Sequence, residues 1–108
     1  MAAHFARLRG AVVVAMLCLA GWPAAAQEAL YVRTLAANCA QCHGTDGRPV
    51  AGSAVPAIAG RPREELAAQL KAFKAGTRSS TIMQQLARGY TDAQLDRLAA
   101  YFAAQGRP

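Results

Sequence analysis

The chain has 108 residues and a formal net charge of +6, with 54% hydrophobic and only 17% charged residues. This length allows one small domain, and because much of the hydrophobic content is alanine, the side chains alone provide a modest core. Aromatic residues make up 6% of the chain and do not alternate with basic clusters, which argues against a nucleic-acid-binding protein.

The first 26 residues have the pattern of a secretory signal peptide. A basic start with Arg7 and Arg9 precedes an apolar stretch over residues 11–20, and residues 24–26 form a small-residue cleavage site of the A-x-A type. The alternative is an uncleaved membrane anchor, because the uncharged stretch over residues 10–26 approaches the ~20 residues of a spanning helix. We predict cleavage before Gln27, which leaves a periplasmic domain over residues 27–108 without a membrane span.

The first predicted helix of this domain runs from about Glu28 to Ala37 and leads into the run Cys39-Ala40-Gln41-Cys42-His43. This run is C-x-x-C-H, the attachment sequence for a covalently bound c-type haem. One helical turn presents both sulfurs on one face, where they can form thioethers with the two haem vinyl groups. The imidazole that follows then reaches the iron as the proximal ligand.

Two other chemistries use C-x-x-C, namely zinc sites and thioredoxin-like redox proteins. A structural zinc site needs four ligands, and outside the run the chain offers only Cys18 and His4, both in the predicted signal peptide. A dithiol redox motif is expected after a strand in a βαβ unit, whereas the residues around Cys39 are rich in alanine and favour helix. The pattern therefore favours one covalent haem c.

The remainder of the chain predicts two more helices and no alternating strand, so the fold class is all-α. Turn-forming residues predict a long loop over residues 44–60. A helix follows from Pro62, at the first helical position, to Gly76, with a buried stripe of Leu66, Leu70 and Phe73. The last helix starts with a capping box at residues 91–94 and continues to Gly106, and its apolar stripe contains Leu95, Leu98, Ala99 and Phe102. In a domain this small, the haem itself is expected to form part of the core.

Met83 is the candidate for the second axial ligand of the iron. Met1 and Met16 lie in the predicted signal peptide, so residues 27–108 contain one methionine and one histidine, His43. A lone methionine often fills a gap in a core. Beside a C-x-x-C-H run we favour axial ligation, since a His/Met pair is the usual arrangement in cytochromes c and raises the reduction potential.

The segment Asn38-Cys39-Ala40-Gln41-Cys42-His43-Gly44-Thr45-Asp46-Gly47 resembles the haem site of the small bacterial class I cytochromes c. The resemblance covers residues 28–105 and implies a few helices packed around one haem. Within it, residues 55–60 are similar to the proline loop of the family, which implies that the Pro56 carbonyl accepts a hydrogen bond from the His43 imidazole. Tyr101 or Phe102 is similar to the aromatic residue of the last helix that packs across the first.

The segment from Ser80 to Asp92 is similar to the cytochrome subunit of flavocytochrome c sulfide dehydrogenase. That resemblance implies a haem subunit that accepts electrons from a sulfide-oxidising flavoprotein in the periplasm, with other periplasmic redox proteins as further partners. Some members carry two haems in two domains, whereas this sequence contains one C-x-x-C-H run. A two-haem relay within this sequence is therefore excluded.

Two alternatives to the flavoprotein-linked role stay open. One is a free-standing periplasmic electron shuttle, which needs the same His/Met site. The other is a haem enzyme or gas sensor, which needs an open or labile distal position and is disfavoured because no distal histidine is available as an acid or base. Arg61 and Tyr90 are candidates to bind the haem propionates, although each equally suits a solvated or packing role.

Overall fold

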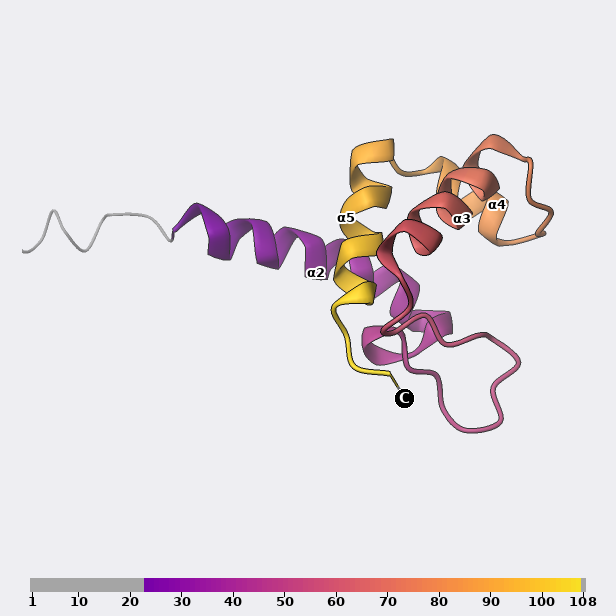
Figure 1. The fold of residues 1–108 in the computed structure, drawn as a ribbon, viewed down its shortest axis with the longest axis horizontal. Helices are drawn as coiled ribbons and strands as arrows, with labels where there is room; N and C mark the ends of the chain where they lie inside the picture. Colours follow the sequence, from indigo (N-terminus) through magenta and orange to yellow (C-terminus); the bar gives the residue numbers. More distant parts are fainter. Residues whose placement is uncertain (1–22, 108) are drawn as a thin grey trace, which may run out of the picture.

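The computed structural model describes residues 23–107. In this range the chain forms four α-helices and a single 3₁₀ turn, without a strand, so the predicted all-α class is confirmed. Figure 1 shows α3, α4 and α5 gathered together, while the first turns of α2 project away from them. None of the helices in residues 23–107 combines the length and the apolar character needed to cross a membrane.

Helix α2 (Ala24–His43) is longer than the sequence pattern predicted, since it begins four residues earlier and includes the whole C-x-x-C-H run. No glycine or proline interrupts this stretch, and its many alanines are the strongest helix formers. The helix ends at Gly44, whose φ of 80° is a conformation that favours glycine. The predicted cleavage point before Gln27 falls in its first turn, and the rest of the predicted signal peptide, residues 1–22, lies outside the described residues.

Helices α3 (Arg63–Ala75) and α5 (Asp92–Ala103) pack against each other and supply most of the core. Helix α3 carries two glutamates in its first turn and ends on Gly76 in the left-handed conformation, as its sequence predicted. Pro62 occupies the N-cap and not the first helical position, because its ψ of 133° is extended. The central cluster of buried side chains consists of Ala36, Leu66, Leu95, Leu98, Ala99 and Phe102.

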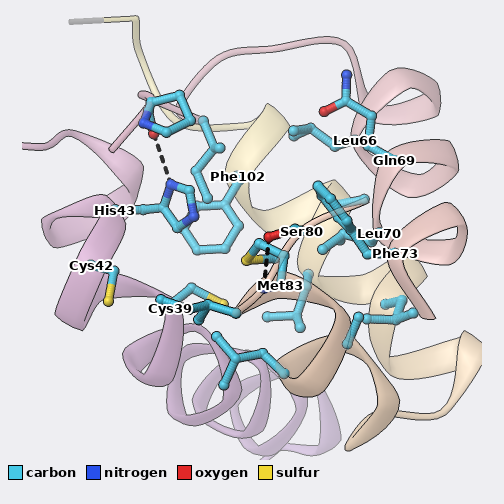
Figure 2. Close-up of a pocket in the computed structure, with 18 of the residues that line it drawn as sticks. Cys39, Cys42, His43, Leu66, Gln69, Leu70, Phe73, Ser80, Met83 and Phe102 are labelled. Carbon is cyan, nitrogen blue, oxygen red and sulfur yellow. Dashed lines mark hydrogen bonds between the residues drawn. The ribbon is translucent and has the colours of Figure 1, made fainter. Parts of the chain in front are cut away.

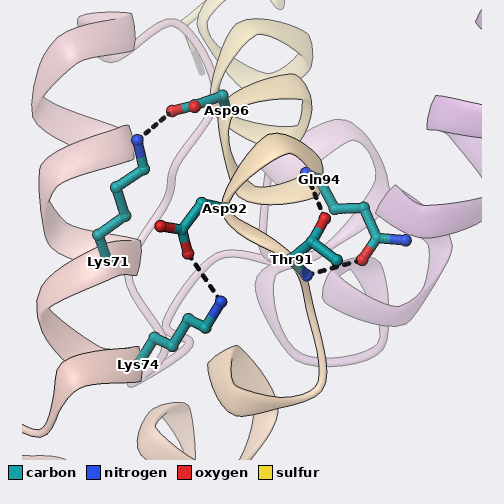
Figure 3. A network of polar contacts seen from close by, with 6 residues as sticks. All are labelled: Lys71, Lys74, Thr91, Asp92, Gln94 and Asp96. Atoms are coloured by element: carbon teal, nitrogen blue, oxygen red, sulfur yellow. Dashed lines mark hydrogen bonds and ion pairs between the residues drawn. The ribbon is translucent and has the colours of Figure 1, made fainter.

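Polar contacts join α3 to α5 along their solvent-facing side (Figure 3). The Nζ atoms of Lys71 and Lys74 each lie 2.7 Å from a carboxylate oxygen, on Asp96 and Asp92 respectively. The predicted capping box at the start of α5 is also present, because the Gln94 N–H donates to Thr91 Oγ1 while the Thr91 N–H donates to Gln94 Oε1. The helix ends at Ala103, three residues before the predicted Gly106.

Two short elements complete the fold, and neither was predicted from the sequence. The turn η1 (Thr45–Gly47) follows α2 directly and opens the long loop toward α3. Helix α4 (Met83–Arg88) lies between α3 and α5 and packs on α3. A helix of six residues is too short for an apolar period to reveal it. It places Met83 on a regular element, at the first residue of the helix.

Candidate haem site

The two cysteines and the histidine of the C-x-x-C-H run are presented by the last turns of α2. Cys39 is half-buried and Cys42 is exposed, and both are free thiols. Burial raises the pKa of the Cys39 thiol, an effect that a backbone hydrogen bond partly opposes, so the neutral thiol is favoured near neutral pH. Both side chains line the same cavity as His43 (Figure 2).

The His43 ring is oriented by the long loop between η1 and α3. His43 Nδ1 lies 2.7 Å from the carbonyl oxygen of Pro56, so the Nδ1–H tautomer donates this bond. The other ring nitrogen, Nε2, points away from that carbonyl and stays available as an electron-pair donor. This is the arrangement through which a metal-ligating histidine is fixed in orientation and made more basic.

Hydrogen bonds from the C-terminal segment hold both ends of the loop that carries Pro56. At one end, Arg48 Nε donates to the Gly106 carbonyl at 2.9 Å. At the other, the Gly60 N–H donates to the Phe102 carbonyl at 2.8 Å, and the Gly60 carbonyl accepts from Arg107 Nε at 3.3 Å. Residues 102–107 therefore bracket the loop on which the His43 acceptor lies.

The turn after the C-x-x-C-H run is fixed by three further hydrogen bonds. Asp46 has a positive φ of 54°, and its Oδ1 accepts a 2.5 Å hydrogen bond from the Tyr101 hydroxyl. The Gly47 carbonyl accepts from the Ile58 and Ala59 N–H groups at 3.0 and 3.2 Å. A Cβ atom at Gly47 would lie 2.8–2.9 Å from atoms of Ile58, Ala59 and Phe102, so only glycine fits here.

The cavity beside His43 has a volume of about 450 Å³, within the range of cofactor sites, and its lining is mostly apolar. Leu66, Leu70 and Phe73, predicted as a packing stripe of α3, all line it, and α5 contributes residues that include Phe102. Leu66 is buried and belongs to the core, whereas Leu70 and Phe73 are only half-buried. The apolar stripe of α3 therefore contributes both to the core and to the cavity wall. A large, flat, apolar group matches this lining.

Met83 enters the cavity from α4, whereas His43 enters it from α2 (Figure 2). The Met83 N–H donates to Ser80 Oγ at 3.1 Å, while the N-cap position is occupied by Ile82, whose side chain makes no capping hydrogen bond. Sequence reasoning did not assign Ser80 a role, and the usual capping pattern does not reveal it, because Ser80 lies two residues before the N-cap. The donor set on this cavity is therefore two thiols, one imidazole and one thioether. This set fits a covalently attached haem with two axial ligands.

The structure gives each of the two candidate propionate ligands a partner within the protein, although both line the cavity. Arg61 pairs with Glu65 one helical turn later, and the same carboxylate oxygen accepts from Gln69 Nε2 at 3.0 Å. The Tyr90 hydroxyl accepts a 3.1 Å hydrogen bond from Asn38 Nδ2. A zinc reading finds no support, because residues 23–107 contain no group of three or more His, Cys, Asp or Glu side chains placed to hold a metal.

Comparisons with known proteins agree with this geometry. The cytochrome subunit of sulfide dehydrogenase from Chlorobaculum tepidum is 43% identical over 68 residues, which is 63% of this chain and 60% of that protein. The thiosulfate dehydrogenase electron acceptor of Thiomonas intermedia is 34% identical over 93% of this chain and 46% of its own length. Cytochrome c4 of Pseudomonas aeruginosa is 37% identical over 82% of this chain and 44% of its own length. The chain thus spans about half the length of these relatives.

The model of the cytochrome c family matches residues 29–105, which include the C-x-x-C-H run, the Pro56 loop, Met83 and the whole of α5. The match therefore covers every element that surrounds the cavity. This chain belongs to the cytochrome c family.

Proposed function

We propose that this cytochrome c is the haem subunit of a periplasmic complex and accepts electrons from a flavoprotein that oxidises sulfide. Its family membership makes it an electron-transfer protein that carries covalent haem c. Two of the relatives named above are a cytochrome subunit of sulfide dehydrogenase and an electron acceptor of thiosulfate dehydrogenase. The identity of the donor and the compartment are the proposed parts.

Four residues would hold the haem. Cys39 and Cys42 would form the two thioethers, His43 would bind the iron on one side and Met83 on the other. Haem supplies one-electron redox chemistry when bound. The chain's own part is to fix the two ligands in place, and the 2.7 Å contact of His43 Nδ1 with the Pro56 carbonyl is the observation that carries this assignment.

Two lines support sulfide as the source of electrons. The first is the 43% identity to the sulfide dehydrogenase subunit. The second is the segment over residues 80–92, which carries Met83 and whose sequence resembles the same class of subunit. Within the fold this segment forms α4 and reaches the first residue of α5, Asp92. Arg61 and Tyr90 retain their proposed role toward the propionates, because both lie at the cavity.

A free-standing periplasmic shuttle is the second candidate. The observation that favours it is the match to the thiosulfate dehydrogenase electron acceptor, which extends over 93% of this chain. Both candidates require export, for which the basic and apolar pattern of residues 1–26 is the sequence signal. Removal of that segment would leave residues 27–108 as the electron carrier.

The test is a gentle affinity purification of the tagged chain from its native periplasm, followed by visible spectroscopy of the eluate. Flavin in a fixed ratio to haem, with reduction of the haem on addition of sulfide, is the expected result. An untagged culture treated in parallel measures non-specific capture. Haem without flavin, together with reduction by a thiosulfate-oxidising extract and not by sulfide, would replace this proposal with the free shuttle.

A further inference from the structure

We propose that the corner between the end of α3 and α4 is the surface on which an acidic redox protein docks to exchange electrons. This docking surface consists of Arg78, Ile82, Leu86 and Arg88. The inference rests on the proposed electron-transfer role, but it does not depend on which substrate the partner oxidises.

Charge is the first observation. Residues 66–91 contain four cationic side chains and no aspartate or glutamate. Two of the four, Lys71 and Lys74, are neutralised by carboxylates of α5. Arg78 and Arg88 have no carboxylate partner among residues 23–107. The corner therefore carries a local positive charge that the rest of the domain does not balance.

The two guanidinium groups are held at the same corner. Arg78 lies over the Phe73 ring, with its Cζ 4.8 Å from the ring centroid. Arg88 reaches back to the end of α3, because a Cβ atom built on Gly76 would lie 3.9 Å from its Nη2. Gly76 is only two residues before Arg78, so both cations flank the end of α3. Contacts of this kind reduce the side-chain entropy lost when a partner binds.

Apolar exposure is the second observation. Ile82 and Leu86 expose 62% and 46% of their surface although both are large and aliphatic. They lie one turn apart, immediately before and within α4, between the two arginines in the sequence. An apolar centre with arginine beside it is the composition found at protein interfaces, where Arg is enriched. The partner that complements it has an apolar patch surrounded by carboxylates.

The third observation is the position of this surface relative to the cavity. Ile82 and Leu86 both border the cavity beside His43. Figure 2 shows Met83 projecting into the same cavity. A protein that lies on them is therefore close to the proposed axial ligand, and electron transfer becomes much faster as the separation shortens. Carboxylates on the partner would be drawn to the same place by Arg78 and Arg88, which increases the rate of productive encounter.

The test compares two charge reversals in the intact holoprotein. Arg88→Glu changes the docking surface at a residue that does not line the cavity, and Arg63→Glu makes the same change in charge at the other end of α3. Reduced flavodoxin, a small acidic flavoprotein, serves as the electron donor in stopped-flow measurements of haem reduction. At low ionic strength Arg88→Glu should slow the second-order rate by about tenfold, while Arg63→Glu changes it by less than about twofold. At high salt the two variants should converge, because the charges are screened.

Integrity is checked by the visible spectrum and the reduction potential, both of which should match those of the unmodified chain. Arg78→Gln provides a second variant of the same surface and should also slow the reaction at low salt. Equal slowing by Arg63→Glu, or no slowing by Arg88→Glu, would overturn the proposal. Binding to phosphatidylglycerol vesicles is measured for the same variants. If Arg88→Glu loses that binding while haem reduction by flavodoxin keeps its rate, the proposal is overturned in favour of a membrane-binding surface. Because flavodoxin does not oxidise sulfide, this outcome is independent of the sulfide test above.

Discussion

The two sides of the cavity are held by different kinds of structure. On the proximal side, His43 ends a helix of 20 residues and shares a hydrogen bond with the Pro56 carbonyl. On the distal side, Met83 begins a helix of six residues and is anchored by the Ser80 hydroxyl. The His43 ring is thus held by its own hydrogen bond, whereas the hydrogen bond at Met83 holds the backbone and leaves the side chain to be placed by packing in the cavity. With both residues on the iron as proposed, the imidazole would be the more firmly oriented ligand.

The largest effect should come from removing the two thiols on the proximal side. In the Cys39→Ala/Cys42→Ala double variant we expect no haem to remain bound after denaturation, because both thioethers are absent. The domain should also lose stability, since the haem is expected to form part of its small core. Haem staining of a denaturing gel measures the first effect and circular dichroism the second. Stable haem staining in the double variant would contradict the attachment site.

Truncation of Met83, the proposed distal ligand, should change the redox properties most. In Met83→Ala we expect a reduction potential lower by roughly 0.1–0.3 V, part of the range of about 0.8 V that axial ligands span. The open position should also bind carbon monoxide. Leu86→Ala is the matched control, because it truncates a side chain of the same helix that also lines the cavity but carries no sulfur. A normal spectrum and potential in Met83→Ala would refute the ligand assignment and reopen the haem enzyme or gas sensor reading.

The proximal turn can be tested with two glycines of nearly identical φ. Gly47→Ala places a Cβ within 2.8–2.9 Å of three neighbouring groups, whereas Gly52→Ala meets nothing within 4 Å. Their φ values are 82° and 80°, so both variants place a side chain on backbone that favours glycine, and they differ in what the new Cβ meets. We expect Gly47→Ala to lose a further 1–3 kcal/mol or so of unfolding free energy through overpacking. Urea unfolding measures both, and equal losses would mean that the crowded turn relaxes easily.

Tyr101 tests the link between the proximal turn and α5. Its hydrogen bond to Asp46, more than burial, raises the pKa of the phenol. The native state therefore holds the phenolic proton of Tyr101 more tightly than the unfolded chain does. The resulting stabilisation of the fold is complete below the ordinary tyrosine pKa near 10, and it is lost as the pH rises through the higher native pKa. Tyr101→Phe should cost about 1 kcal/mol at neutral pH and weaken the alkaline loss of stability.

The matched control for Tyr101 is Tyr31→Phe, because the Tyr31 hydroxyl accepts from Gln94 and has no carboxylate partner among the described residues. Urea midpoints at pH 7 and at about pH 11 give the comparison, the upper value being set just above the ordinary tyrosine pKa. The loss of stability between the two pH values could stay unchanged in Tyr101→Phe and become smaller in Tyr31→Phe. That result would show that the contact of Tyr101 with Asp46 does not cause the alkaline loss of stability.

The smallest effect concerns the polar contacts between α3 and α5. The hydrogen bond from Lys74, with its charge second, lowers the pKa of Asp92. The stabilisation is therefore present above the ordinary carboxyl pKa and is lost as pH falls through the lower native value. Asp92→Asn should remove this part of the stability loss at acid pH. The change in unfolding temperature between about pH 6 and about pH 3 would measure it. Lys74→Gln should remove the same part of the acid loss of stability. If that part persists in both variants, the pairing of Lys74 with Asp92 is contradicted.

Much of the fold was predictable because its helices obey local rules. The buried residues of α5 and its capping box follow from spacing within twelve residues, and Gly76 ends α3 where the sequence indicates. Helix α4 was not predictable in this way, since six residues contain less than two turns. The full extent of α2 was underestimated at both ends, because neither glycine nor proline marks a boundary within Ala24–His43.

The candidate site shows the same difference between features that are local in the sequence and features that join distant residues. The chemistry of Cys39, Cys42 and His43 is local to five residues, so the motif alone indicates it. The bond between Asn38 and the Tyr90 hydroxyl joins residues 52 positions apart, and no pattern in the sequence indicates it. The pairing of Arg61 with Glu65 has the i, i+4 spacing that favours an ion pair on a helix, yet the arginine precedes the helix, and the sequence indicated only a propionate, solvated or packing role for it.

The frame around the Pro56 loop makes the His43 contact depend on residues far along the chain. The loop is tied at Arg48 and Gly60 to residues 102–107, more than forty positions beyond Gly60. Those residues must therefore fold back onto the loop before the carbonyl that accepts from His43 is held at both ends. A shortened chain that ends before residue 102 would keep the C-x-x-C-H run but lose the frame that orients its histidine.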